Sequence, residues 1–329
     1  MAQRDTNPYK YSDSNKRYMT YDWYMKRRYG GKVAKITLDI GCTCPNIDGT
    51  CGRGGCIYCK NGSRSAVGET IAEQYERGVS VACRKWKPVG FIPYLQSHTN
   101  TYGDTAYLRE KYAEAASLPG AVMLDIATRA DCLGDDIISL LTQTAEKIPL
   151  TVELGLQTTS DTTAEAINRG HTFAGFCDGY SRLKSAADMI NAGFPTDDPL
   201  LKRFMICVHI INGLPGETAD DMRQTAHDVA ALHPDMVKIH LLHVLSETAL
   251  AKLYEDGGYV PMTREDYVNV VCDQLELLPS DTVIARVTGD GIADDLLAPQ
   301  WSRRKTEVAN EIDKELYRRQ TWQGKEHKE

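Results

Sequence analysis

The chain has 329 residues, of which 42% are hydrophobic and 25% are charged, and its net charge is −7. This composition is typical of a globular protein and excludes a disordered or fibrous chain. The length permits either one barrel-sized domain or two smaller domains. Residues 1–15 are polar, and no apolar run approaches the ~20 residues that span a bilayer. We therefore expect a soluble, cytoplasmic protein with no membrane partner.

Apolar segments of strand type alternate with helical patterns along most of the chain. The expected strands are residues 32–40, 90–97, 121–128, 150–158, 203–212, 236–245 and 282–288. The expected helices are residues 68–86, 105–116, 135–147, 174–191, 218–232 and 264–278. Strands that alternate with helices predict right-handed crossovers and a parallel sheet. Six or seven such units over roughly 250 residues favour an α/β fold of the TIM-barrel type, and we expect a partial (β/α)6 barrel.

The N-terminal segment differs in charge from the rest of the chain. Residues 1–35 contain nine Lys and Arg residues against three Asp, a net +6, which leaves −13 for the remainder, and they also contain seven Tyr or Trp residues. Such a segment either folds onto the domain as an amphipathic arm or holds RNA through phosphate contacts and base stacking. We divide the chain into this basic aromatic arm (1–30), a barrel core (31–245) and a C-terminal extension (246–329) that ends in a charged helical pattern and a polar stub.

The cysteines are clustered. Five of the ten lie in one short segment, namely Cys42, Cys44, Cys51, Cys56 and Cys59. A tight group in a long cytoplasmic chain indicates a metal or redox site rather than a disulfide framework. The segment directly follows the first expected strand, so it lies at the end of the barrel where active sites are built. Its glycines allow the backbone to approach a bulky centre closely.

Two metal chemistries are compatible with thiolate ligands. A structural zinc site usually takes two CxxC-like pairs, and only Cys56 and Cys59 have that spacing. An iron–sulfur cubane held by three cysteines leaves one iron open, which the amino and carboxylate groups of S-adenosylmethionine (SAM) can chelate. An electron passed through the cluster then splits the sulfonium into methionine and a 5′-deoxyadenosyl radical. The spacing favours this radical SAM hypothesis over zinc or incidental cysteines.

The cysteine segment also resembles the cluster loop of the YhcC/YtqA radical SAM family, which is related to the catalytic subunit of Elongator. Further segments resemble motifs of this family in the same order along the chain. They are residues 94–102, 128–133, 153–158, 168–172, 209–218 and 288–290. Two positions depart from the family pattern: Ala130 stands where a proline is usual, and Cys51 stands where an apolar residue is usual.

The resemblance implies a 4Fe-4S cluster with Cys44, Cys56 and Cys59 as its ligands. Eleven residues separate the first two of these cysteines and two residues separate the last two. Cys42 and Cys51 are then extra cysteines, which we interpret as a buried thiol or a loop thiol. SAM is the second cofactor that the resemblance implies.

Alternation along the strands predicts a set of polar side chains that point into the barrel. Tyr94, Gln96 and His98 share one strand face, and Glu153 and Gln157 share another. Lys238 with His240, and Arg286 with Thr288, repeat this pattern. A charged side chain in an apolar strand is costly unless it is paired or bound to a ligand. These residues therefore form either a ligand site or an internal polar network.

By similarity to radical SAM barrels, several of these side chains are expected to contact SAM. Glu153 would bind the ribose hydroxyls, Gln96 would face the amino group, and Arg169 would bind the carboxylate. Asn212 and Gly213 would lie beside adenine. Tyr58 would stack near adenine, and Gln157 would share the cofactor site. We assign no catalytic residue.

The family resemblance implies action on tRNA, at the aminomethyl-type side chain of a wobble uridine. The implied step returns a carboxymethylated amine to the amine, with hydrogen abstraction from the carbon next to nitrogen. The basic arm offers a way to hold an anticodon loop. A reductant such as flavodoxin or ferredoxin is expected. The alternatives are a radical SAM enzyme for a small metabolite or peptide, and a non-enzymatic zinc protein that binds RNA.

Overall fold

The computed structural model describes residues 7–60, 68–289 and 294–328, and Asp290 of the last predicted motif lies outside them. The strands are β1 (Val33–Leu38), β2 (Gly90–Leu95), β3 (Leu124–Thr128), β4 (Leu150–Gln157), β5 (Phe204–Asn212), β6 (Met236–Leu241), β7 (Val244–Leu245), β8 (Val283–Arg286) and β9 (Leu296–Ala298).

The longer helices include α1 (Tyr21–Tyr29), α3 (Ile71–Lys85), α4 (Thr105–Ala116), α5 (Asp135–Lys147), α7 (Phe173–Gly193), α8 (Ala219–Ala231), α10 (Arg264–Leu277) and α11 (Lys305–Arg318). The shorter helices include α2 (Pro45–Asp48), α6 (Asp161–Ala166) and α9 (Ala249–Glu255), together with 3₁₀ turns at Ala130–Cys132 and Gln300–Arg304.

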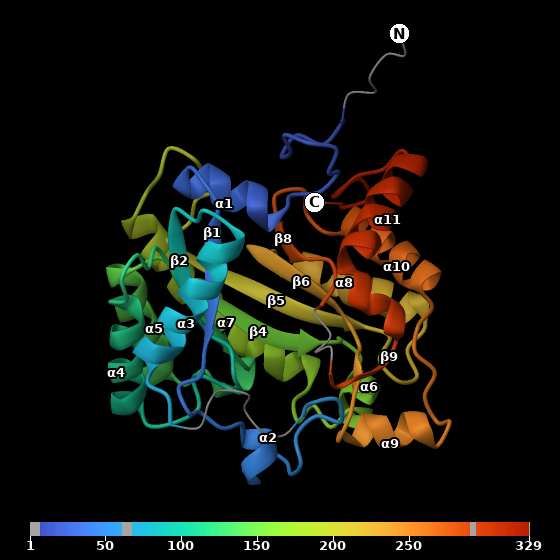
Figure 1. The fold of residues 1–329 in the computed structure, drawn as a ribbon, viewed down its shortest axis with the longest axis horizontal. Coiled ribbons are helices and arrows are strands. Elements are labelled where there is room, and N and C mark those ends of the chain that lie inside the picture. Colours follow the sequence, from blue (N-terminus) through green and yellow to red (C-terminus); the bar gives the residue numbers. More distant parts are fainter. Residues whose placement is uncertain (1–6, 61–67, 290–293, 329) are drawn as a thin grey trace.

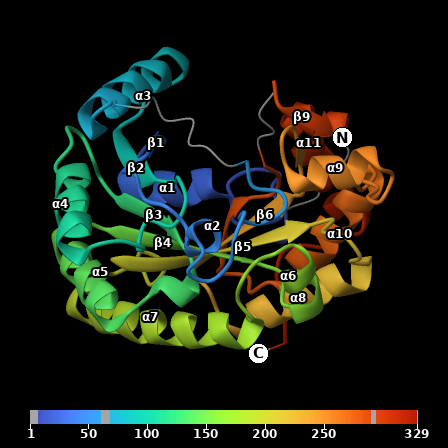
Figure 2. The ribbon, with the colours of Figure 1, turned by 90° about the horizontal axis from the view of Figure 1, so that it is seen from below.

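Seven parallel strands form one curved sheet in the order β1-β2-β3-β4-β5-β6-β8. The helices cover its outer face, and the sheet curls into a half-barrel that is open at one side (Figures 1 and 2). Because every strand runs the same way, all the carboxyl ends meet at one rim. The prediction of an α/β partial barrel is confirmed.

The central strands are apolar because both of their faces are covered. In β4 every residue from Leu150 to Leu154 is buried, and the first five residues of β5 are buried as well. This continuous burial is what parallel strands require when helices pack behind them and side chains fill the barrel in front. The sheet therefore supplies a rigid frame whose inner face carries the polar side chains described below.

Helix starts are encoded by local capping residues. Thr70 and Glu73 form a reciprocal capping box at the start of α3, and Thr218 and Asp221 form another at α8.

Helix α7 packs on β5 and on α5, while α10 packs between α8 and α11. No helix in the described part of the chain is long and apolar enough to cross a membrane.

The seven predicted strands and six predicted helices all form, with ends that differ by a few residues. The strand expected over 236–245 is divided, because Val244 and Leu245 leave the main sheet and pair with β9 in a separate two-stranded sheet. The polar stub expected at the C-terminus is largely built into the fold. Gln323, which is fully buried, binds Met19, Pro279 and Thr282.

The described part of the N-terminal arm closes the amino-terminal end of the barrel. Tyr9, Tyr18 and Tyr24 are each less than 5% exposed. α1 contacts β1 and β8, and its Tyr24 and Tyr29 hydroxyls donate to backbone carbonyls that precede β5 and β3. Of the two interpretations of the arm, the structure shows the one in which it folds onto the domain, and contact with an anticodon loop stays a prediction. Most aromatic rings of the arm pack in a hydrophobic cluster with residues of the sheet. The arm lies at the end of the barrel opposite the cysteine loop (Figure 1).

Replacement of Tyr24 by alanine tests this packing role. Its ring is 1% exposed and its hydroxyl donates to the Leu200 carbonyl at 2.9 Å. We expect Tyr24→Ala to lower the free energy of unfolding by about 3–5 kcal/mol in urea titrations, because it removes a large buried side chain. Lys26→Ala is the matched control on the same helix. Its side chain is 53% exposed, so its replacement should leave the free energy of unfolding almost unchanged. Equal losses in the two variants would contradict the assignment.

Candidate active site

A cavity of about 710 Å³ lies at the carboxyl ends of the strands, beneath the cysteine loop. Its wall includes Thr37 from β1, Tyr94 from β2, Glu153 from β4, His209 from β5 and Lys238 from β6. In Figure 2 the view is onto this rim, with α2 over the sheet. The cavity brings together eight of the ten predicted site residues: Cys44, Cys56, Tyr58, Cys59, Gln96, Glu153, Gln157 and Arg169.

Two predicted site residues are placed elsewhere. Asn212 is 1% exposed, and its amide exchanges two 2.8 Å hydrogen bonds with the amide of Gln274. The Gly213 carbonyl accepts from the Tyr259 hydroxyl at 2.7 Å. Neither residue lines the cavity. The sequence pattern located the end of β5 correctly. It could not show that the Asn212 side chain would form hydrogen bonds with Gln274 of helix α10.

The cysteine loop is ordered mainly by its own backbone. Cys44 is the N-cap of α2, and the Cys51 N–H donates to the Pro45 carbonyl at 2.8 Å. The Cys59 N–H donates to the Cys56 carbonyl at 2.9 Å, which closes the CxxC turn. Gly54 and Gly55 have φ values of 82° and 75°, a left-handed conformation that side chains other than glycine rarely adopt. The loop thus directs three cysteines toward the cavity.

The other two cysteines of the segment do not line the cavity. Cys42 is packed in the main hydrophobic core, and burial raises the pKa of its thiol to about 11. Cys51 is exposed. Both positions agree with the interpretation of Cys42 as a buried thiol and Cys51 as a loop thiol.

Two arginines lie beside the cysteine loop. Arg129 is paired with Asp131 at 2.7 Å and donates to the Arg169 carbonyl at 2.9 Å, while Arg169 itself donates to the Gly155 carbonyl. Each is less than 5% exposed. A hydrogen bond from Cys59, with help from both guanidinium groups, lowers the pKa of the Cys56 thiol to about 5. Arg129 lies in the segment 128–133 that resembles a motif of the family, but it was not among the predicted site residues.

The floor of the cavity is a network of buried charges centred on Glu153. One of its oxygens accepts from Lys35 at 2.8 Å. The other accepts from Tyr94 at 2.5 Å, from His209 at 3.0 Å and from Lys238. Lys35 also pairs with Asp125 of β3. These neighbouring cations hold the pKa of Glu153 well below its usual value even though burial acts to raise it.

This network affects the predicted contact between Glu153 and the ribose of SAM, and it contains two charged residues that were not predicted. Both oxygens of Glu153 already accept hydrogen bonds, so the contact with ribose stays a prediction that requires rearrangement of these partners. Lys35 and Asp125 were missed by the sequence analysis. The same signal that selected Lys238, a charged residue in an apolar strand, was present in both segments and could have found them.

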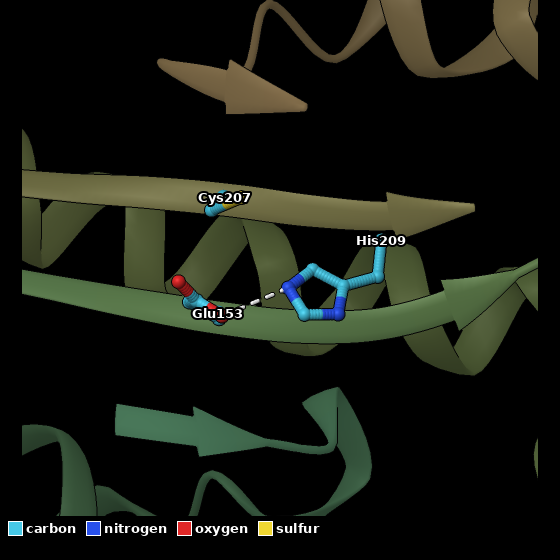
Figure 3. Close-up of side chains that lie close together, drawn as sticks. All are labelled: Glu153, Cys207 and His209. Atoms are coloured by element: carbon cyan, nitrogen blue, oxygen red, sulfur yellow. Dashed lines mark hydrogen bonds and ion pairs between the residues drawn. The ribbon is translucent and has the colours of Figure 1, made fainter. Parts of the chain in front are cut away.

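Glu153, Cys207 and His209 lie close together at the centre of the sheet (Figure 3), with their potential ligand atoms within 4.8 Å of one another. A cation at this point would meet the ammonium groups of Lys35 and Lys238, which already neutralise the carboxylate. Burial also raises the pKa of the Cys207 thiol, so this residue is a poor source of thiolate. The trio is therefore part of the charge network rather than a metal site.

The cysteine loop fits an iron–sulfur cluster better than zinc. In a tetrahedral zinc site with Zn–S bonds of about 2.3 Å, the sulfurs are about 3.8 Å apart. Among the residues that the structure describes, Cys44, Cys56 and Cys59 do not have all three sulfurs within 4.8 Å of one another. A cubane spreads its ligands more widely and leaves one iron open. The nearby guanidinium groups also suit a centre with net negative charge.

Comparisons with known proteins agree with this chemistry. Residues 47–229 match the Radical SAM superfamily, and residues 234–318 match the Radical_SAM C-terminal domain. The chain is 40% identical over 323 residues to the uncharacterized protein YtqA of Bacillus subtilis, covering 97% of this chain and 95% of YtqA. It is 33% identical to protein YhcC of Escherichia coli K12, covering 89% of this chain and 90% of YhcC.

The chain belongs to the YhcC/YtqA-type radical SAM family. Human Elongator complex protein 3 is a more distant relative, 26% identical over 60% of this chain and 32% of its own length. Among solved structures, the archaeal Elp3 of Methanocaldococcus infernus has a TM-score of 0.63 at 16% identity, covering 88% of this chain and 64% of that chain. Methylornithine synthase (PylB) has a TM-score of 0.50 at 11% identity, covering 92% and 86%. These two likenesses show the fold alone.

Family membership decides between the hypotheses left open by the cysteine spacing. The protein is a radical SAM enzyme, and the cofactors of its family are a 4Fe-4S cluster and SAM. The hypothesis of a non-enzymatic zinc protein is wrong. Cys44, Cys56 and Cys59 are the residues that would hold the cluster, and this assignment remains our prediction for the individual ligands.

Single cysteine variants test the ligand assignment. After anaerobic reconstitution, Cys44→Ala, Cys56→Ala and Cys59→Ala should each contain little iron and sulfide and should not cleave SAM, because each lacks one thiolate ligand. Cys51→Ala is the matched control from the same loop, since this thiol is exposed and does not line the cavity. It should bind iron and cleave SAM as the native protein does. Loss of the cluster in Cys51→Ala with retention in Cys44→Ala would refute the assignment.

His209 gives the network a pH dependence that can be measured. Burial, and then the charge of Lys238, lower the pKa of His209 to about 4 from an ordinary value of 6.5. Between these values the unfolded chain takes up a proton that the folded protein does not. Folding stability should therefore fall as the pH decreases from 6.5 toward 4, by up to about 1.36 kcal/mol per pH unit.

A variant isolates the contribution of His209. In urea titrations at pH 7, 6 and 5, His209→Gln should lose less stability than the native protein as the pH decreases. The loss of stability attached to Glu153 does not interfere, because a carboxylate with a lowered pKa loses its contribution only at more acidic pH. Identical losses in both proteins would show that folding does not lower the pKa of His209.

Proposed function

We propose that this radical SAM enzyme acts on tRNA and converts a carboxymethylated aminomethyl side chain of a wobble uridine to the amine. The observation that carries the proposal is a wall of the cavity that is built from two cationic and two imidazole side chains, whose N–H groups are hydrogen-bond donors for an anionic group. His209, Lys238, His240 and Arg286 project there from β5, β6 and β8. A substrate carboxylate can bind to such a wall, whereas a neutral or cationic substrate gains little from it.

The size of the cavity supports a substrate that enters through one extruded group. Its volume of about 710 Å³ lies within the range of roughly 300–1,000 Å³ that small-molecule sites occupy. A folded RNA cannot enter a space of this size. The unpaired bases of a loop can be splayed out of their stack, and proteins that act on a base take it into a pocket in this way. The wobble base of an anticodon loop meets this requirement.

One relative that is named for a tRNA function supports the choice of tRNA. A Methanocaldococcus jannaschii protein named tRNA uridine(34) acetyltransferase is 26% identical over 287 residues, which cover 73% of this chain and 49% of that protein. This chain covers only about half of that relative. The proposal therefore extends the uridine specificity, and not the acetyl transfer, to this chain.

When bound, the cluster and SAM would supply a 5′-deoxyadenosyl radical, the hydrogen-atom acceptor for the substrate carbon next to nitrogen. The conversion balances if the substrate then gives up one further electron to the oxidised cluster and water adds to this carbon, so that the C–N bond breaks, the amine is released and the carboxymethyl group leaves as glyoxylate, with SAM as the net oxidant. The residues of this chain bind and shield the reacting groups. Gln96, Gln157 and Arg169 line the cavity, and we propose that they contact SAM. The β5–β8 wall would hold the substrate carboxylate, which fixes the adjacent carbon at the centre of the cavity. A small electron-transfer protein such as flavodoxin or ferredoxin is the proposed reductant.

The nucleosides of tRNA from a strain that lacks the gene provide the test. Mass spectrometry should detect more of the carboxymethylated wobble nucleoside and less of its amine product than in the parent strain. The native gene should restore the parent pattern. Cys56→Ala should not restore it, since this variant lacks a predicted cluster ligand. An unchanged set of wobble uridines in the deletion strain would exclude this substrate and leave a small metabolite or a peptide as the alternative.

A further inference from the structure

A buried asparagine contacts one of the predicted cluster ligands. Asn46 lies in the first turn of α2, between Cys44 and Cys56 in the sequence, and it is 0% exposed. Its side-chain N–H donates to the Cys56 sulfur at 3.7 Å, and also to the backbone carbonyl of Asn168. This is the only amide side chain with a hydrogen bond to a cysteine of the loop among the residues that the structure describes.

The surroundings of Asn46 are shaped to admit its side chain. A Cβ atom on Gly52 would lie 2.2 Å from the Asn46 side-chain oxygen, and one on Gly170 would lie 2.8 Å from it. The backbone N–H of Gly55 also donates to the Asn46 carbonyl at 2.9 Å. Two glycines from different loops thus leave room for one amide. Any larger residue at either position would push it away from Cys56.

Asn46 belongs to a clasp between the cysteine loop and the loop that precedes α7. From the opposite side, the Asn168 side chain donates to the carbonyls of Arg53 at 3.1 Å and Gly55 at 2.7 Å. Both asparagines therefore join the same two loops. They differ in one respect, because Asn46 has a hydrogen bond to a cysteine sulfur, whereas the hydrogen bonds of the Asn168 side chain go to backbone carbonyls.

An N–H donor to a cluster thiolate changes the electronic properties of the cluster. It withdraws electron density from the sulfur and stabilises the reduced form, which carries one more negative charge, so the reduction potential rises. The effect is strong in a site closed to water, where the local dielectric constant is low. The Tyr58 hydroxyl also reaches Cys56, but it comes from the CxxC turn itself.

We propose that Asn46 is a positioning residue that raises the reduction potential of the iron–sulfur cluster through its hydrogen bond to the Cys56 thiolate. The inference concerns the family cofactor and is independent of the identity of the substrate. It assigns to Asn46 a function that neither the cysteine spacing nor the cavity wall indicates. Without this donor, the cluster would accept an electron from its reductant less readily.

The test is a redox titration of the reconstituted protein, followed by the electron paramagnetic resonance signal of the reduced cluster. Asn46→Asp keeps the shape of the side chain but replaces the donor with a carboxylate. We expect the ratio of reduced to oxidised cluster at a fixed potential to fall about tenfold, which corresponds to about 59 mV for one electron. Asn46→Ala, which removes the donor without adding charge, should change the ratio in the same direction by less.

Asn168→Gly is the matched control, because it loosens the same clasp, suits the positive φ of 53° at this position, and removes no donor to sulfur. It should change the ratio by less than threefold at equal iron and sulfide content. The proposal is overturned if both Asn46 variants bind a full cluster with an unchanged potential, or if Asn168→Gly shifts the potential equally. It is also overturned if neither Asn46 variant takes up iron, because Asn46 would then be needed only to fold the loop.

Discussion

The ion-paired carboxylate of Glu153 is the constraint around which the barrel is organised. An unpaired carboxylate at 1% exposure would cost several kcal/mol. Its partners come from four different strands: Lys35 from β1, Tyr94 from β2, His209 from β5 and Lys238 from β6. Both ammonium groups also lie over the Tyr94 ring, with that of Lys35 at 4.9 Å and that of Lys238 at 4.8 Å from the ring centre. A shift of any one strand would leave a charge without its partner.

This network also separates two ends of the molecule that serve different purposes. Toward the amino ends of the strands, the N-terminal arm and α1 pack with methionines such as Met19, Met25 and Met205 in a second hydrophobic cluster, and the buried Gln323 ties the C-terminal segment to the same end. Toward the carboxyl ends, the inner face is polar and opens into the cavity. Radical chemistry needs this arrangement, because a reactive intermediate must be kept from water and from unintended hydrogen donors.

The loops above the cavity are held to each other rather than to the sheet alone. The cysteine loop and the loop before α7 exchange side-chain and backbone hydrogen bonds through Asn46 and Asn168, and Arg129 binds the Arg169 carbonyl of the second loop. These hydrogen bonds hold the cysteines and the two arginines together above the cavity, although the two loops are far apart in the sequence.

The order of the strands and helices, the rim on which the site lies, and the three cysteines expected to bind the cluster could all be predicted from the amino-acid sequence. These features follow from local patterns, because strand alternation, capping residues and cysteine spacing are written in short segments. The pairing of the polar groups, in contrast, is visible only in the folded protein. Lys35 and Asp125 joined the network, Asn212 turned to Gln274, and the aromatic arm was buried. Those outcomes depend on contacts between residues far apart in the chain, where burial forces each charge and amide to find a partner that no local pattern specifies.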